Sequence, residues 1–148
     1  MTLDVSTEII IDHPIDKVAA YASNPDHVQE WYVNIKSVEW KTKKPLIEGS
    51  RVAFKAKFLG RTLAYTYEFS ELELSRRLVM KTFEGPFPME TIYTWEAIDP
   101  QTTRMTLRNR GIPSGFSRLF APLMASAIKR ANSKDLENLK CILEDSAY

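Results

Sequence analysis

Three tyrosines and one asparagine are the residues of this sequence best suited to polar chemistry. Tyr65 and Tyr67 stand two positions apart in an alternating segment, and Tyr93 and Asn109 stand in two further segments of that kind. Residues two apart on a β-strand share a face. Gathered in one pocket, their hydroxyl and amide groups could bind a carbonyl or enolate oxygen, as an oxyanion site does. The alternative is that they only orient an apolar ligand, because ligand sites are typically apolar with a few placed polar groups.

The sequence shows no other recognisable catalytic or cofactor-binding motif. His13 and His27 are far apart and lack the spacing of a metal site. Cys141 has no evident histidine partner that would make it a nucleophile. The sequence contains no glycine-based phosphate or dinucleotide motif. We therefore expect no metal and no cofactor, and the catalytic residues, if there are any, stay unknown.

Carboxylates could supply acid–base chemistry if they lay inside the pocket. Strand alternation places Glu68, Glu90 and Glu96 on the outward face. Asp135 or Asn138 in the last helical segment could reach the pocket, and one helical turn decides which.

Composition and charge exclude several classes of protein. The 148 residues carry 20 Lys and Arg against 19 Asp and Glu, a balance that gives no electrostatic reason to expect nucleic acid. No apolar stretch is long enough to cross a bilayer, so we expect no stable membrane insertion. The first residues do not resemble a signal peptide, and the default location is cytoplasmic. The oligomeric state stays open.

The elements that must position these side chains follow a simple order. Residues 5–12 alternate as a strand, and the segments around "HPIDKVAAYASNP" and "SNPDHVQEWY" predict two short helices. About six further strands fill residues 35–112, with turn signals so close together that neighbouring strands must be antiparallel. A long helix follows Pro113, with Leu123, Ala127 and Leu136 among its recurring apolar positions. This order predicts an α+β fold in one domain, residues 1–148.

The same order resembles the SRPBCC or START-like helix-grip superfamily, in its bacterial polyketide cyclase/dehydrase-like branch. The resemblance is carried by "IIIDHPIDKVAAYASNPDHVQEWY", by "RRLVMKTFEGPFPMETIYTWEAID" with "TRMTLRNRG", and by "FSRLFAPLMASAIKRANSKDLENLKCILE". It implies a curved antiparallel sheet of about seven strands gripping a long C-terminal helix, with two short helices after the first strand. It further implies a deep cavity between the sheet and that helix.

Strand parity and this resemblance together predict which side chains line the cavity. Inward positions alternate along each strand, although a β-bulge would reverse them. The predicted ligand-binding residues are Trp31, Phe54, Phe58, Tyr65, Tyr67, Phe69, Met80, Thr82, Tyr93, Trp95, Asn109, Phe120 and Met124. The ligand is expected to enter near residues 85–88 and near Trp31 and Tyr32.

Two functions follow as hypotheses. The first is the binding of a hydrophobic or aromatic small molecule, such as a lipid or a polyketide-like compound, in the cavity. The alternative is an enzyme of the cyclase or dehydratase type that acts on a polyketide-like or aromatic substrate there. A protein-interaction role would need a large exposed apolar patch, which the strand parity does not suggest.

Overall fold

Seven antiparallel strands form one sheet in the computed structural model, which describes residues 3–85, 88–112 and 121–145. Across the sheet the strands lie in the order β1-β7-β6-β5-β4-β3-β2, so all neighbours except β1 and β7 are consecutive in the chain. The strands are β1 (Leu3–Ile11), β2 (Ile35–Trp40), β3 (Arg51–Phe58), β4 (Arg61–Glu73), β5 (Arg77–Glu84), β6 (Met89–Asp99) and β7 (Thr102–Gly111).

Short helices follow the first strand, as expected from the prolines there. Their bounds are α1 (Ile15–Ser23), the 3-10 helix η1 (Pro25–His27) and α2 (Val28–Trp31). Helix α1 begins directly after Pro14 and ends before Asn24, whose side chain accepts a hydrogen bond from the backbone N–H of Asp26. Most apolar side chains of α1 and α2 are buried, Val18, Tyr21, Val28 and Trp31 among them, which fixes both helices against the sheet.

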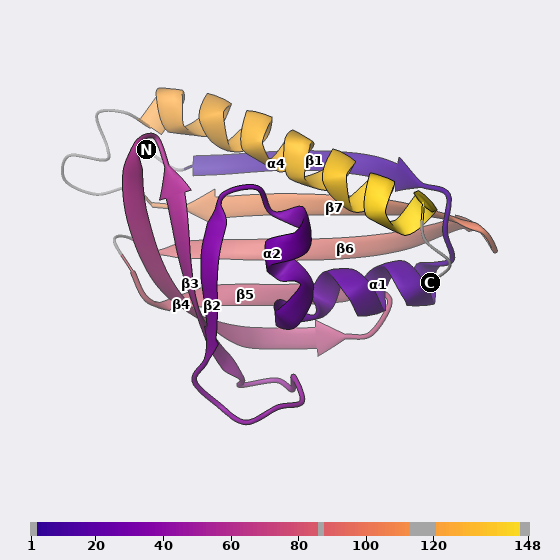
Figure 1. The fold of residues 1–148 in the computed structure, drawn as a ribbon, viewed down its shortest axis with the longest axis horizontal. Coiled ribbons are helices and arrows are strands. Elements are labelled where there is room, and N and C mark those ends of the chain that lie inside the picture. The colour runs from indigo at the N-terminus through magenta and orange to yellow at the C-terminus, as the bar shows by residue number, and fades with distance from the viewer. Residues whose placement is uncertain (1–2, 86–87, 113–120, 146–148) are drawn as a thin grey trace.

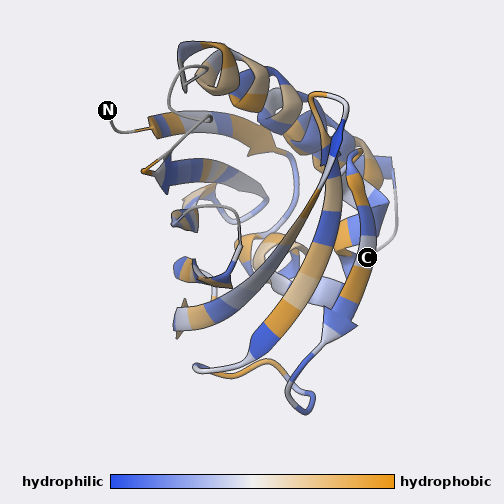
Figure 2. Ribbon diagram, turned by 90° about the vertical axis from the view of Figure 1, so that its left-hand side faces the viewer, coloured by the Kyte–Doolittle hydropathy of each residue, from blue (hydrophilic) through white to orange (hydrophobic). Residues whose placement is uncertain are grey.

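The long helix α4 (Ala121–Asp145) lies across the curled sheet and contacts β1 and α2 (Figure 1). A second view shows how strongly the strands curve around the side on which the helices lie (Figure 2). The predicted fold, an α+β arrangement with a curved antiparallel sheet and a long C-terminal helix, is therefore confirmed. Among the described residues, no helix combines the length and the apolar character that a membrane crossing requires.

The buried stripe of α4 is apolar at both ends and polar in the middle. Met124 and Ile128 pack near Leu3 and Val5, and the leucines at 136, 139 and 143 join the main core. Between these groups lie Asn132 and Asp135, which are 6% and 3% exposed. The expectation that Leu123 belongs to the packed face is wrong, because Leu123 is 58% exposed.

Candidate functional site

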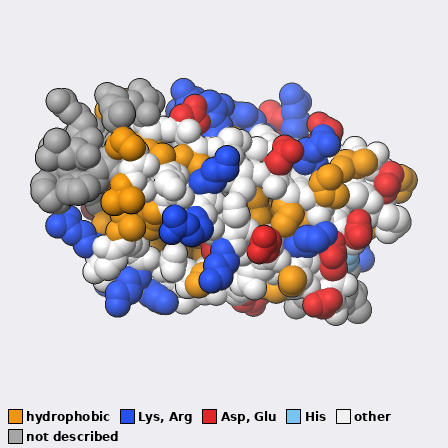
Figure 3. Space-filling model, turned by 90° about the horizontal axis from the view of Figure 1, so that it is seen from above, with side chains coloured by type: hydrophobic (Ala, Val, Ile, Leu, Met, Phe, Trp, Pro, Cys, Tyr) orange, Lys and Arg blue, Asp and Glu red, His pale blue; other side chains and the backbone are white. Residues whose placement is uncertain are grey.

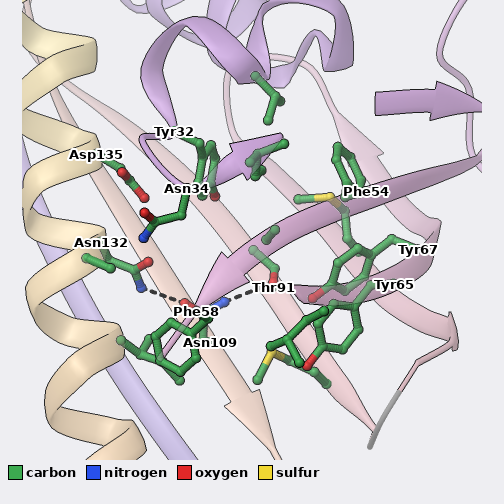
Figure 4. A pocket seen from close by; sticks show the side chains of 18 of the residues that line it. Tyr32, Asn34, Phe54, Phe58, Tyr65, Tyr67, Thr91, Asn109, Asn132 and Asp135 are labelled. Atoms are coloured by element: carbon green, nitrogen blue, oxygen red, sulfur yellow. Dashed lines mark hydrogen bonds between the residues drawn. The ribbon is translucent and has the colours of Figure 1, made fainter. Parts of the chain in front are cut away.

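A pocket of about 170 Å³ lies between the inner face of the sheet and α4, and the segment from α1 to β2 closes one side. Besides the short helices, seven elements contribute to its walls: the six strands from β2 to β7, and α4. Figure 4 shows its two unlike sides: aromatic rings project from β3 and β4, while amide and carboxyl groups lie toward α4.

The aromatic side depends on strand alternation. Phe54 and Phe58 on β3 and Tyr65 and Tyr67 on β4 all line the pocket. Tyr65 and Tyr67 stack with ring centroids 5.7 Å apart, and Phe54 meets Tyr67 edge-on at 5.9 Å. Such offset and edge contacts stabilise aromatic pairs by about 0.5–1.5 kcal/mol beyond area burial. The rings are therefore held in place before any ligand arrives.

A chain of side-chain hydrogen bonds crosses from α4 to the sheet. The amide of Asn132 donates to Oδ1 of Asn109 at 2.5 Å, and Nδ2 of Asn109 donates to Oγ1 of Thr91 at 2.9 Å. All three residues line the pocket, and Figure 4 draws both bonds. Because each amide is oriented by its neighbour, the polar groups of this wall have fixed directions.

Two tyrosine hydroxyls meet at the wall formed by α2 and β6. The hydroxyl oxygens of Tyr32 and Tyr93 are 2.7 Å apart, and burial raises the pKa of both groups well above the usual range. Burial also raises the pKa of Tyr67 to about 12, although its contact with Thr91 opposes the shift. The phenols therefore remain neutral at ordinary pH and act as hydrogen-bond donors as well as acceptors.

Asp135 is the carboxyl group that the described structure places in the pocket wall. Burial raises its pKa to about 6, while a hydrogen bond of 3.0 Å from the backbone N–H of Val33 lowers it in part. The sequence left open whether Asp135 or Asn138 faces the pocket. Asn138 is instead exposed, and its amide donates to the backbone oxygens of Glu30 and Trp31.

Most of the predicted ligand-binding residues line this pocket. Those that do are Phe54, Phe58, Tyr65, Tyr67, Phe69, Met80, Tyr93, Asn109 and Met124. Their contact with a ligand stays a prediction, because their position on the wall shows only that a ligand could reach them.

Four predicted residues do not belong to the described wall. Trp31 and Trp95 are buried in the core, where both rings pack against Tyr93. Thr82 uses its hydroxyl to join β5 to β6, donating to the backbone oxygen of Met89 at 2.7 Å and accepting from its N–H at 2.9 Å. Phe120 lies outside the described residues, as do residues 86–87 of the loop where ligand entry was expected.

Several wall residues were not among the predicted site residues. Tyr32, Asn34 and Asn132 belong to segments whose inward direction the sequence does not show, because neither the turn after α2 nor the middle of α4 has an apolar pattern. For Asn132 the sequence does offer a signal: it lies four residues from both Ile128 and Leu136, and residues at that spacing share one face of a helix.

The histidines and acids form no metal centre in the part of the chain that the structure describes, where no group of three His, Cys, Asp or Glu side chains could hold an ion. His27 stacks on the ring of Tyr21 at a centroid distance of 4.4 Å. Cys141 is exposed near the end of α4, not packed. The polar groups on the wall of the described pocket include tyrosine hydroxyls, asparagine amides and the carboxyl group of Asp135.

The fold and this wall define a helix-grip domain with an internal pocket, and comparison with known proteins agrees. Residues 2–144 match the model of the family described as polyketide cyclase / dehydrase and lipid transport. Because the match spans nearly the whole chain, the protein belongs to this family. No curated protein sequence matches the chain.

Solved structures with the same fold come from several bacteria. A Thermus thermophilus protein has a TM-score of 0.84 at 17% identity, covering 98% of this chain and 99% of its own. The Zhui aromatase/cyclase of a Streptomyces species has a TM-score of 0.83 at 15% identity, with 97% and 94% covered. A START superfamily protein of Mycobacterium smegmatis has a TM-score of 0.79 at 11% identity, with 96% and 97% covered. At these identities the likeness shows a shared fold.

Proposed function

We propose that the protein binds a hydrophobic or aromatic small molecule in the pocket between the sheet and α4. The observation that carries the proposal is the composition of the wall: aromatic and aliphatic side chains from five strands face a few polar groups that are already hydrogen-bonded. Ligand sites in proteins have this composition. The family, whose description includes lipid transport, supports the same reading.

The polar groups suit a ligand that carries a carbonyl or hydroxyl oxygen. The paired hydroxyls of Tyr32 and Tyr93 and the amides of Asn109 and Asn132 come from the turn after α2 and from β6, β7 and α4. Their mutual hydrogen bonds hold them rigidly, so a ligand oxygen would meet oriented donors at a small entropic cost. An apolar molecule without such an oxygen would leave these groups paired with one another.

A substitution on β3 that adds side-chain volume inside the pocket tests the proposal. Ala56 of β3 lines the pocket, whereas Ala53 of the same strand lies on the opposite face. A panel of fatty acids, sterols and aryl ketones is screened by thermal shift and then by calorimetry. We expect Ala56→Leu to weaken the affinity for each hit at least tenfold and Ala53→Leu to leave it within twofold. Absence of any hit, or equal effects of the two substitutions, would contradict the proposal.

A specific observation also favours the enzyme alternative. Asp135 combines burial, a position on the pocket wall and a pKa near 6, which are the features of a general acid–base group at neutral pH. Its charge adds to the effect of burial in raising the pKa of Tyr32 and Tyr93, which line the same pocket.

This arrangement fits proton removal next to a carbonyl. The Asp135 carboxylate would take a proton from the carbon beside a ketone, and the tyrosine hydroxyls would hydrogen-bond the enolate oxygen. In a dehydration, the protonated Asp135 would return that proton to the departing β-hydroxyl, so that a C=C bond and water form. A simple aryl ketone such as 2-acetylnaphthalene reports the first step through deuterium uptake in D2O.

We expect the wild type to accelerate that uptake and Asp135→Asn to abolish the acceleration. The substitution keeps an oxygen that can accept from the N–H of Val33, so the fold is retained. An uptake rate equal to that of buffer, although the ketone binds, would contradict the enzyme alternative and leave the binding proposal in place.

A further inference from the structure

A second cavity, of about 430 Å³, adjoins the pocket at one end of the sheet. It lies between the segment from Val33 to Lys36, the turn that joins β3 to β4, and one side of α4. The two cavities share the wall residues Asn34, Lys57, Phe58, Ala131 and Asp135. The second cavity therefore forms a mouth to the first.

Most of the charged residues in the wall of this mouth are cationic. Lys36, Lys57, Arg130 and Lys134 line it, against the single carboxyl group of Asp135. All four cationic residues are exposed, and within the described part of the chain none of them forms an ion pair. The net charge of the whole protein is +1, so the excess at the mouth is a local feature.

The surface view agrees with this distribution. On the face that carries α4, Lys and Arg side chains gather toward the half where α4 begins, whereas Asp and Glu are more frequent toward the other end (Figure 3). Several opposite charges elsewhere on the surface are paired, for example Arg108 with Asp4 and Arg104 with Glu96. The mouth is distinguished by having four cationic residues along one cavity wall.

Stability of the fold does not account for these charges. Arg130 and Lys134 are four residues apart on α4, and like charges at that spacing destabilise a helix. Lys57 comes close to the other side of the mouth, because its backbone N–H donates to the oxygen of Asn34 at 2.9 Å. A bound anion would offset the repulsion among these groups.

We propose that the ligand of the pocket is an amphipathic anion, with an apolar body among the aromatic rings and a terminal carboxylate or phosphate among the four cations of the mouth. This inference rests on the proposed binding function and specifies its ligand class. It follows from two adjoining cavities, the inner one lined mainly by apolar side chains and the outer one carrying four cationic residues on its wall.

The sizes of the cavities support a ligand that occupies both. An apolar cavity of about 150 Å³ holds a benzene molecule. The inner pocket of about 170 Å³ therefore takes an aromatic body of one or two rings, or a short chain. The remainder of a larger ligand must lie in the mouth, where Lys57, shared by both cavities, stands at the boundary.

The test compares three probes that share one ring system: 2-naphthoate, 2-naphthyl phosphate and the neutral 2-naphthamide. Calorimetry at low salt gives the affinity of the wild type for each. We expect the anions to bind about tenfold tighter than the amide, because several partly screened charge contacts, each of them weak, add together. The advantage should shrink at high salt, where exposed charges are screened. A preference for one anion over the other identifies the head group.

Two double substitutions locate the effect. Lys57→Gln with Lys134→Gln removes two charges of the mouth, and Lys17→Gln with Lys43→Gln removes two exposed charges that line neither cavity. We expect the first pair to weaken binding of the anions about fivefold to tenfold and of the amide less than twofold. The second pair should change neither affinity beyond twofold.

The outcomes separate the two proposals. If the amide and the anions bind the wild type equally, the inference is overturned while the binding function stands; the cations would then face some other partner, such as an acidic protein surface. If the two double variants behave alike, the inference is overturned as well. If none of the three probes binds although the panel of fatty acids, sterols and aryl ketones gives hits, the inference is overturned and the binding function stands; if neither set binds, both fail.

Discussion

The hydroxyl of Tyr32, just after α2, lies 2.7 Å from the hydroxyl of Tyr93 in β6. This contact joins residues 61 positions apart and closes the pocket on the side of the short helices. The ring of Trp31 stabilises this contact, because it packs against Tyr32 and Tyr93 at centroid distances of 4.2 and 5.8 Å. The pair therefore belongs both to the core and to the pocket wall.

Removing one hydroxyl of this pair should destabilise the protein. Tyr93→Phe leaves the buried hydroxyl of Tyr32 without its partner, and such a loss costs about 1–3 kcal/mol. Urea unfolding measures the change. The double variant with Tyr32→Phe removes both hydroxyls, and it should lose less than the sum of the two single variants. Additive losses would contradict a direct interaction between the two groups.

Stability should depend on pH through Asp135. Burial raises its pKa from 3.8 to about 6 in the folded protein, so the folded state holds this proton more tightly than the unfolded state does. Its contribution to stability is complete below about pH 4 and is lost as the pH rises through 6. The pKa difference corresponds to on the order of 3 kcal/mol.

Asp135→Asn should therefore stabilise the protein at pH 7.5 by on the order of 2–3 kcal/mol relative to wild type and change it little at pH 4. Urea unfolding at the two pH values is the measurement. Glu137→Gln, an exposed change on the same helix, serves as the control and should show no such difference. A wild type whose stability does not fall between pH 4 and 7 relative to Asp135→Asn would contradict the assignment.

Strand alternation predicted the sheet and the aromatic wall because burial follows a two-residue period on a curved sheet with one wet face. Phe54, Phe58, Tyr65 and Tyr67 were found in this way. Strand alternation shows on which face of the sheet a side chain lies, but not how deeply that side chain is buried. It therefore did not distinguish Trp95, which is in the core, from its neighbours on the pocket wall.

The polar side of the pocket was less accessible to sequence reasoning. Asn132 and Asp135 interrupt the apolar stripe of α4, and a polar residue in a helix usually indicates the solvent side. Their inward direction follows from tertiary contacts with Asn109 and Val33, which are 23 and 102 positions away. The placement of the whole chain in one domain stays a prediction.

The link between α4 and the sheet should be measurable in stability. Asn132→Ala removes the donor to Asn109 and leaves a partly buried amide oxygen without its partner, at a cost of about 1–3 kcal/mol. Asn138→Ala, on the same helix, removes only longer bonds of 3.3 and 3.4 Å from an exposed amide and should cost under about 1 kcal/mol. Equal losses in urea unfolding would contradict the role of Asn132.

Gly85 should be required for the position of the Tyr65 ring. A Cβ added at Gly85 would lie 2.5 Å from Cδ1 of Tyr65 and 2.9 Å from Cγ2 of Thr82, which is closer than real contacts allow. Gly85→Ala must therefore displace the ring, and we expect ligand affinity to fall at least threefold together with a loss of about 1–3 kcal/mol in stability. Calorimetry and urea unfolding check both effects, and unchanged affinity would contradict this account of the aromatic wall.

The methionine methyl groups report directly on whether a small molecule enters the pocket. Met80, Met89 and Met124 line it, whereas Met105 is fully buried elsewhere in the core. Methyl NMR of protein labelled with ¹³C at methionine is recorded during titration with 2-naphthoate. We predict saturable shifts of the three wall methyls and little change at Met105. No shift at all, or shifts confined to methyls outside the wall, would contradict the claim that the space between the sheet and α4 is a ligand site.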